Sequence, residues 1–443
     1  MEMNVREFTD RLLAAAQAAG LSPAQVSARS TESFKAGARE GKLEVYEVSD
    51  EMTVTLRGKA SGRIGTASTQ ALDEESIDML IRGVRESAEL IETDEQDEIM
   101  PPDEHYESVV NFSEALENVS AEEKIALAME IDRRLTGADA RLKADQSIVV
   151  TSSETYMLRN TLGLDLSHRS NLIYAYTGAL ASEEGDSASG FKLLWGHKPD
   201  DVRAQDVAQG CVDDALSKLH AGRLKSGEYP VVIRAGAMAD LLTTFAGIFS
   251  AENAQQGLSL LNGREGETIA SGCVTIADDP LMPWGLGSSP FDREGAATYK
   301  KNVVEGGVLK TLLHNRKTAR KAGVTTTGNA AGSGRVAPSN LYIVPGEATV
   351  DDLLAELGDG LYLTEVTGLH AGANAVSGDF SLLSRGFVVE GGTVARPVEQ
   401  FTVAGNFYKL LESVERVGSD LRFEGSPIGS PSVRVKALSV AGE

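Results

Sequence analysis

The chain has 443 residues, of which 42% are hydrophobic and 24% are charged, and its formal net charge is −23. This composition is typical of a soluble globular protein of two or three domains, and the negative charge argues against binding to nucleic acid or to an anionic membrane surface. Two distant cysteines, Cys211 and Cys273, exclude a disulfide framework and a cysteine-rich zinc site.

The first lobe is expected over residues 1–95. Apolar residues recur at helical spacing from Val5 to Ala16, and Gly20 ends this helix. The N-terminus therefore reads as a charged start followed by an amphipathic helix, with no signal peptide. A second helical pattern covers residues 73–91. Between the helices, strand-like runs separated by Gly, Ser and Asp predict an antiparallel sheet, and they cover residues 24–34, 43–48, 52–57 and 63–67.

An acidic linker is expected over residues 96–119. The stretch 92–107 is rich in Glu and Asp, contains Pro101-Pro102, and has too few apolar residues to build an element of the core.

A second lobe is expected over residues 120–222. It opens with a helix whose first residues, Ser120 and Glu123, fit a capping box. A helix at about 202–220 ends the lobe. Four strand-like runs lie between these helices, at residues 142–152, 154–160, 165–177 and 179–195.

The remaining residues, 223–443, predict a β-rich domain. A strand at 229–234 is followed by an apolar helix at 236–250, and short helices are expected at 350–357 and 407–412. The many glycines favour tight turns and antiparallel sheet. The fold class predicted for the whole chain is α+β, with a two-lobed N-terminal half that contains antiparallel sheets and a β-rich C-terminal domain.

The histidines offer no familiar metal motif. The closest pair in sequence is 23 residues apart, so no helix face can present two imidazoles to one ion. His370 lies in the Gly-rich run Thr367–Asn374 and is the histidine most suited to a functional site. No phosphate-binding loop, dinucleotide fingerprint or serine-hydrolase elbow is present in the sequence.

Several local motifs resemble those of the TldD/PmbA family of peptidases. They follow one another in the order expected for that family over most of the chain, most clearly from Tyr229 to the end. They are Gly257–Ser271, Phe291-Asp-Arg-Glu-Gly295, Thr318–Gly323, Thr327-Gly-Asn-Ala330, Leu361–Glu365, Val376–Ser381, Gly386–Gly392 and Pro397–Asn406.

The resemblance also implies what this chain lacks. In the TldD branch, the apolar helix before Gly257 carries His-Glu-x-x-x-His, which provides two zinc ligands and a catalytic Glu. A gap-free alignment puts Thr243, Thr244 and Gly247 at those positions. The third ligand of the active branch, a Cys, is missing from the corresponding segment 421–432. Without these groups no zinc-bound water can form or be activated, so the chain is similar to the PmbA (TldE) branch.

The expected function follows from that resemblance. The chain is interpreted as the non-catalytic, substrate-enclosing subunit of a TldD/TldE-type metallopeptidase that degrades or processes unfolded peptides. It binds no cofactor itself, zinc belongs to a TldD-type partner, and the location is cytoplasmic. The chain is expected to take part in proteolysis only as part of a complex, and the chain alone is predicted to be inactive. Two alternatives stay open as well: a homodimeric peptide-binding or scaffold protein, and a hydrolase with an unrecognised site near His370 and Asp379.

Substrate contacts are expected in the Gly-rich region 368–381. Small residues let a backbone approach closely, and a peptide held as an added strand gains main-chain hydrogen bonds without sequence selectivity. The candidate substrate-binding residues are His370, Gly372, Asn374, Ser377, Gly378 and Asp379.

Overall fold

The computed structural model describes residues 3–91 and 98–443, with Ser333 and Glu399 described by their backbone alone. Residues 92–97, which contain the predicted start of the linker, lie outside the described residues. Helices and mostly antiparallel sheets occur together, which confirms the predicted α+β class. None of the described helices is both long enough and apolar enough to span a membrane.

The first residues form the expected helix, meander and helix. The elements are α1 (Val5–Ala18), β1 (Ala24–Arg39), β2 (Lys42–Ala60), β3 (Arg63–Thr69) and α2 (Glu74–Glu89). Asn4 and Asp73 cap the two helices by accepting a hydrogen bond from a backbone N–H of the first turn. Both helices pack on the sheet through a shared apolar cluster that includes Phe8, Leu12 and Leu80.

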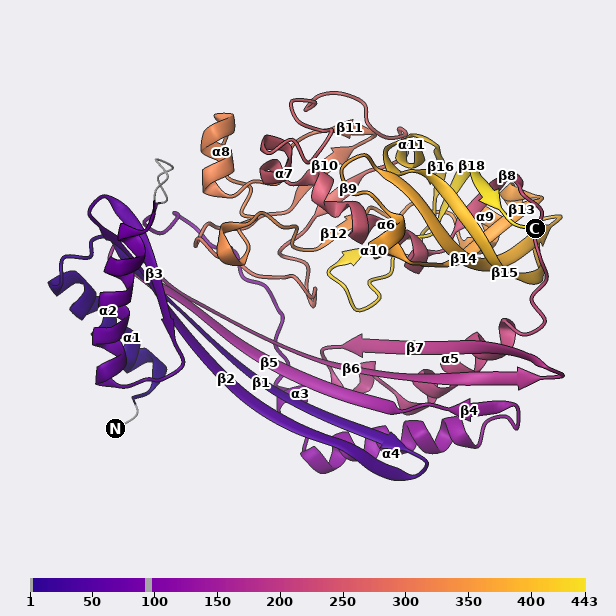
Figure 1. The fold of residues 1–443 in the computed structure, drawn as a ribbon, viewed down its shortest axis with the longest axis horizontal. Coiled ribbons are helices and arrows are strands. Elements are labelled where there is room, and N and C mark those ends of the chain that lie inside the picture. Colours follow the sequence, from indigo (N-terminus) through magenta and orange to yellow (C-terminus); the bar gives the residue numbers. More distant parts are fainter. Residues whose placement is uncertain (1–2, 92–97) are drawn as a thin grey trace.

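The next elements extend the same sheet. They are α3 (Glu114–Glu117), α4 (Ala121–Thr136), β4 (Leu142–Ala144), β5 (Ser147–Asn160), β6 (Asp165–Glu183), β7 (Asp186–Gly196) and α5 (Ala204–Ser217), with the predicted capping box at the start of α4. β5 pairs with β1 from Gln25↔Asn160 to Ala38↔Ser147. The strands of both predicted lobes therefore form one seven-stranded antiparallel sheet, which appears in Figure 1 as a long curved surface below the C-terminal domain.

The hairpin between β6 and β7 lies further along the chain than expected. The sequence pattern suggested a break near Gly178, but β6 continues to Glu183. The chain turns at Glu184 and Gly185, which both have positive φ (51° and 90°). A two-residue turn of this kind matches the twist of an antiparallel pair.

The segment before α3 is irregular but closely attached to the rest of the protein. No helix or strand occurs in residues 98–113. Even so, Ile99 and Asn111 are buried, the backbone O of Val110 accepts from Trp284 N, and the Tyr106 hydroxyl donates to Gly295 O at 2.8 Å. The segment therefore runs along the C-terminal domain and helps to attach it to the sheet.

The C-terminal domain contains two sheets that share one core. Its six-stranded sheet has the order β15-β14-β13-β8-β18-β16, and an additional β15–β18 pairing closes five of these strands into a small barrel. The strands are β8 (Gly227–Ile233), β13 (Gly360–Thr367), β14 (Asp379–Glu390), β15 (Thr393–Asn406), β16 (Val414–Val417) and β18 (Val433–Ala441). The second sheet has the order β11-β10-β9-β12-β17. Its strands are β9 (Ile276–Asp278), β10 (Lys301–Glu305), β11 (Val308–Leu309), β12 (Leu341–Ile343) and β17 (Ile428–Gly429).

The helix α6 (Ala235–Phe245) lies in the middle of this domain (Figure 1). Met238, Leu242 and Phe245 are fully buried in a cluster that includes residues of both sheets. Such a helix is apolar on nearly every face, as the sequence pattern indicated. The other helical segments of the domain are η2 (Ala246–Phe249), α7 (Ala251–Gln255), α8 (Arg316–Ala322), η3 (Gly332–Gly334), α9 (Val350–Leu357), α10 (Leu369–Gly372) and α11 (Phe407–Glu412).

Candidate functional site

The last turn of α6 and the η2 turn that follows it carry the three positions at which the sequence suggested an empty metal site. Thr243 is exposed and Thr244 is half-buried. The Thr244 hydroxyl donates to the backbone O of Asp240 at 2.9 Å, a common bond for a helical Thr. Gly247 begins the next turn, in η2, and its backbone O accepts from Asn253 Nδ2. The side chains at these three positions thus offer two hydroxyl oxygens, those of Thr243 and Thr244, and the Thr244 hydroxyl is engaged with the helix backbone.

These side chains do not fit a zinc ion. Structural and catalytic zinc sites use Cys, His, Asp or Glu ligands. In the described ranges 3–91 and 98–443, no group of three or more such side chains is arranged to hold a metal ion. The chemistry available on this face of α6 is therefore hydrogen bonding and charge.

The segment that follows Leu421 lies against the start of α6. A Cβ added to Gly236 would lie 2.6 Å from a carboxylate oxygen of Glu424, so the glycine makes room for that side chain. β17, from the same segment, also packs on α6. The two parts of the chain from which the zinc ligands of the active branch would come are therefore neighbours.

A carboxyl group at this junction has unusual electrostatics. Burial of its carboxyl, followed by the negative charge of Glu424, raises the pKa of Asp240 to about 6, while Arg234 acts in the opposite direction. Asp240 as a whole remains exposed, so partial desolvation of its carboxyl group is sufficient to raise the pKa. Asp240 was not among the residues predicted from the sequence, although it lies four residues before Thr244 and therefore on the same helix face.

Four of the six predicted substrate residues form one tight turn before β14. The Asn374 side chain accepts from the backbone N–H groups of Val376 and Ser377, and Ser377 Oγ donates to Asp379 Oδ2 at 2.8 Å. The side chain of Asn406 donates to Asp379 Oδ1 at 2.9 Å. These bonds to Asn406 and Ser377 lower the pKa of Asp379.

The glycines of this region approach the chain's own atoms. Gly378 has a φ of +82°, and an added Cβ would lie 2.6 Å from the ring of Tyr408. A Cβ on Gly372 would lie 2.3 Å from the backbone O of Ser381. Turn geometry and packing therefore account for both glycines without any ligand.

His370 and Gly372 lie on the short helix α10, which packs against α6. Figure 1 shows the two helices side by side. His370 is exposed. The predicted substrate residues and the last turn of α6 thus come from neighbouring elements of one region.

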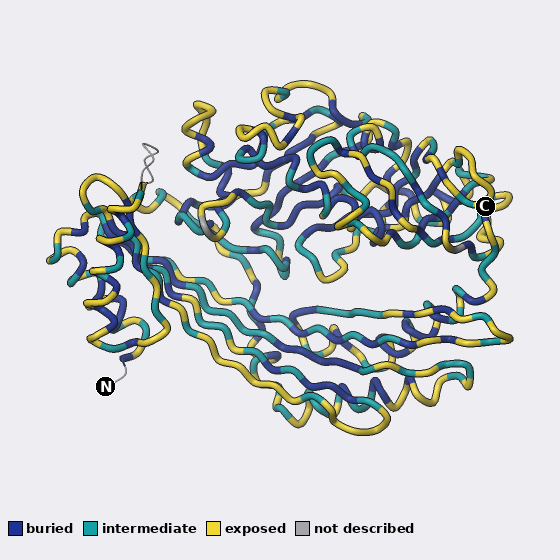
Figure 2. Tube along the Cα trace, in the orientation of Figure 1, coloured by how far each residue is buried: buried dark blue, intermediate teal, exposed yellow. Residues whose placement is uncertain are grey.

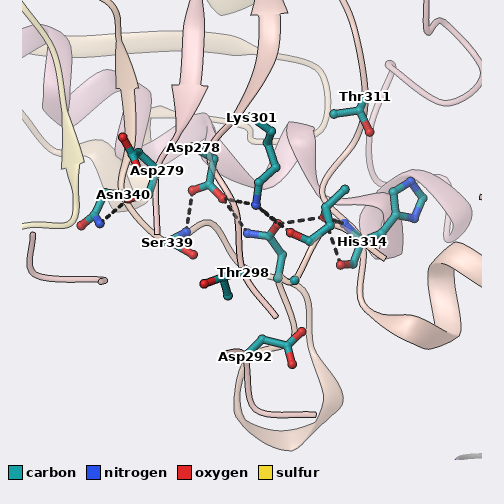
Figure 3. Close-up of polar contacts among 12 residues, drawn as sticks. Asp278, Asp279, Asp292, Thr298, Lys301, Thr311, His314, Ser339 and Asn340 are labelled. Atoms are coloured by element: carbon teal, nitrogen blue, oxygen red, sulfur yellow. Dashed lines mark hydrogen bonds and ion pairs between the residues drawn. The ribbon is translucent and has the colours of Figure 1, made fainter. Parts of the chain in front are cut away.

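The Thr327–Ala330 motif, which resembles a motif of the family, contributes to a buried polar network (Figure 3). Lys301 Nζ donates to Asp278 Oδ2 at 3.1 Å, to the backbone O of Thr327 at 2.7 Å and to Asn329 Oδ1 at 2.9 Å. Asp278 also accepts from Asn329 Nδ2 and from Ser339 N. All three protons of the ammonium group are used, so the Thr327–Ala330 motif holds β9 and β10 together.

Asp292 in the Phe291–Gly295 motif is a second buried carboxyl group. It accepts from the backbone N–H groups of Glu294, Ala296 and Ala330. Burial raises the pKa of Asp292 despite these bonds. The Asp292 carboxyl group therefore fixes the backbone conformation of this loop through hydrogen bonds.

The same motif attaches the C-terminal domain to the N-terminal sheet. The ring of Phe291 stacks on Tyr156 with centroids 6.1 Å apart, and the guanidinium of Arg293 lies 3.9 Å from the centre of the Tyr156 ring. Gly295 has a φ of +79°, and an added Cβ would lie 2.7 Å from Leu164. The motif is thus a docking element between the two parts of the protein.

Comparison with known proteins identifies the family. Three family models match consecutive parts of the chain: PmbA/TldA metallopeptidase domain 1 over residues 24–88, the central domain over 114–219, and the C-terminal domain over 226–442. The chain belongs to the PmbA/TldD metallopeptidase family.

Individual relatives agree with this membership. "Metalloprotease PmbA" of Escherichia coli O157:H7 is 26% identical over 435 residues, which cover 95% of this chain and 92% of that protein. A crystal structure from Thermotoga maritima, described as a candidate modulator of a DNA gyrase, is 34% identical, has a TM-score of 0.92 and covers 98% of this chain and 100% of its own. TldE from Thermococcus kodakarensis shares the fold, with a TM-score of 0.90 at 20% identity over 98% of this chain and 100% of its own.

Proposed function

We propose that this chain is a PmbA/TldE-like subunit of a TldD/TldE-type metallopeptidase that degrades or processes unfolded peptides. In this proposal the chain is the non-catalytic, substrate-enclosing partner, works in the cytoplasm, and binds no zinc. The observation that carries the proposal is the presence of Thr243, Thr244 and Gly247 at the end of α6 and in η2, in a chain matched to the family along nearly its whole length.

The partner in this proposal is a TldD-type chain that supplies both the metal and the catalytic Glu. Thr243, Thr244 and Gly247 offer no imidazole or carboxylate to a zinc ion, so in this proposal hydrolysis occurs on the partner. Residues His370, Gly372, Asn374, Ser377, Gly378 and Asp379 would then line the space in which peptide is held. Support for this comes from the packing of α10 against α6 and from the turn that precedes β14.

Co-expression with a TldD-type chain from the same genome tests the proposal. We expect the two chains to purify together, and we expect an unfolded protein such as reduced casein to be cleaved only when both are present. Recovery of this chain solely as a self-dimer in the presence of the candidate partner would favour the homodimeric scaffold instead.

The unrecognised-hydrolase alternative has its own test. If His370 were catalytic, His370→Ala would abolish cleavage in the reconstituted complex. We expect this variant to retain the maximal rate and at most to raise KM, because the side chain would contact bound peptide without taking part in chemistry.

A further inference from the structure

One stretch of the N-terminal sheet has an open edge. β2 pairs with β1 along its full length, from Ala24↔Gly58 to Arg39↔Lys42. On its other side, β3 pairs only with Val54–Ala60. Among the described residues, no strand pairs with the outer edge of 42–53. About half of the backbone N–H and C=O groups of these twelve residues point away from β1, and the outer edge of the sheet is exposed in Figure 2.

Apolar side chains are exposed along the same stretch. Tyr46 is 57% exposed and Val48 is 64% exposed. Their partners in β1 are Ala36 and Phe34, which belong to the cluster packed beneath α4. The α4 layer thus covers these two residues of β1 but leaves Tyr46 and Val48 of β2 exposed. The rings of Tyr46 and Phe34 pack perpendicular to each other with centroids 5.6 Å apart, and the rest of the Tyr46 side chain remains exposed.

A groove lies beside the exposed residues Tyr46 and Val48 of β2. It has a volume of about 430 Å³ and runs between β2 and the start of α4. Phe34, Tyr46, Val48 and Leu116 give it an apolar floor, and Glu32, Asp50 and Glu117 lie around it with Lys124. An open strand edge next to an apolar groove is the geometry that binds an extended peptide by strand addition.

The charge of the edge selects its occupant. Residues 42–53 contain four acidic side chains and one basic one, namely Glu44, Glu47, Asp50, Glu51 and Lys42. Pairing of this edge with the same edge of a second copy would bring acidic residues together, and like charges opposite each other on a sheet are destabilising. A segment with lysine or arginine between apolar residues would instead complement both the edge and the groove.

We propose that the β2 edge over Lys42–Thr53 binds an extended polypeptide segment in which basic and apolar residues alternate. The segment adds as a strand beside β2, and its apolar side chains cover Tyr46 and Val48. This proposal goes beyond the metallopeptidase function, because it concerns a surface of this chain alone and requires neither metal nor partner.

The binding test uses the full-length chain and two labelled twelve-residue peptides, one alternating Lys and Val and the other alternating Glu and Val. Fluorescence anisotropy at low salt should give a Kd at least tenfold lower for the Lys–Val peptide. Hydrogen exchange should also slow at least fivefold within residues 42–53 when that peptide is bound.

Matched variants separate the edge from general effects. Tyr46→Thr/Val48→Thr should weaken binding at least fivefold, whereas Leu180→Thr should leave it within twofold. Leu180 is also an exposed apolar strand residue, but both of its strand edges are paired.

A second pair of variants tests the charge. Asp50→Asn/Glu51→Gln should weaken binding at least threefold and reduce its salt dependence. Glu86→Gln/Glu89→Gln removes the same charge from the exposed face of α2 and should change neither.

Four results would overturn the proposal. They are absence of binding, equal affinity for the Glu–Val peptide, equal weakening by the control variants, and protection of residues 42–53 that increases with protein concentration in the absence of peptide. The last result would identify a second copy of the chain as the occupant. None of them bears on whether the chain works with a TldD-type partner, since no partner is present.

Discussion

The ion pair between Lys301 and Asp278 should be among the most costly interactions to break in the C-terminal domain. The two side chains are 6% and 0% exposed and lie 3.1 Å apart. Removal of one partner from a buried pair leaves an uncompensated charge and typically costs about 3–5 kcal/mol. We expect Lys301→Met to cost about 3 kcal/mol, the lower end of that range, because Asp278 keeps its bonds from Asn329 and Ser339.

A double-mutant cycle gives the sharper test. Asp278→Asn should also cost about 3 kcal/mol, since it leaves a buried ammonium with neutral acceptors alone. The double variant lacks both charges of the pair, so its cost should be about 2–3 kcal/mol smaller than the sum of the two single costs. As a control, Lys310→Met breaks an exposed pair with Glu305 and should cost under about 1 kcal/mol.

The assay must resolve the C-terminal domain, because a chain of this size does not unfold in a single step. Native-state hydrogen exchange of the peptides that cover β9 and β10 provides the free energy of opening at the pair itself. A cost below about 1 kcal/mol for Lys301→Met, or strictly additive effects in the double variant, would refute the reasoning.

Three further predictions concern other sites. Asp240→Asn should stabilise the chain by about 0.5–1 kcal/mol at pH 7.5, after allowance for solvent screening, and by much less at pH 4. The reason is that the folded-state pKa of Asp240, about 6, lies above its unfolded value near 4, so the wild type loses stability as the pH rises from one value to the other. Equal gains in unfolding free energy at both pH values in urea titrations would be inconsistent with this. Gly295→Ala should accelerate hydrogen exchange on both sides of the docking contact by more than Gly323→Ala does. Both glycines have positive φ, but an added Cβ would lie 2.7 Å from Leu164 at Gly295, whereas nothing lies within 4 Å of a Cβ at Gly323. Equal acceleration by the two variants would mean that the docking contact is not tight. Iodoacetamide at pH 8 should modify Cys273, which is exposed, and spare Cys211, because burial raises the pKa of the Cys211 thiol to about 12. Mass spectrometry of the modified native protein measures both sites, and modification of Cys211 ahead of Cys273 would contradict the prediction.

The sequence was a good guide wherever the signal is local. Helical periodicity located α1, α2 and α6, and α9 has the predicted bounds. The capping box at Ser120 and Glu123 is formed as expected. These features depend on residues within one or two turns of each other, which a single sequence displays directly.

Non-local features could not be predicted in the same way. The pairing of β1 with β5 joins residues more than a hundred positions apart, so the single sheet was hidden behind the appearance of two lobes. The short helix α8 was also missed, because it begins at a cap formed by Asn315 within a basic, poorly periodic stretch. The Phe291–Gly295 motif carried part of the family resemblance in sequence, but its docking role depends on contacts with Tyr156 and Leu164 in the N-terminal half of the chain.

The candidate site likewise combines features that the local sequence predicted with features that depend on contacts between distant segments. The apolar helix that carries Thr243, Thr244 and Gly247 was located from sequence, and so was the Gly-rich region before β14. The closeness of Glu424 to the start of α6, and the resulting pKa of Asp240, follow from a contact between segments nearly 190 residues apart. Such a contact has no signature in one sequence.

Zinc content measured together with peptide cleavage on the same samples tests the central claim most directly. The account predicts less than about 0.1 zinc per chain and no cleavage for the purified chain, and it predicts about one zinc per heterodimer with cleavage after a TldD-type chain is added. Stoichiometric zinc and peptide cleavage by this chain alone would contradict it.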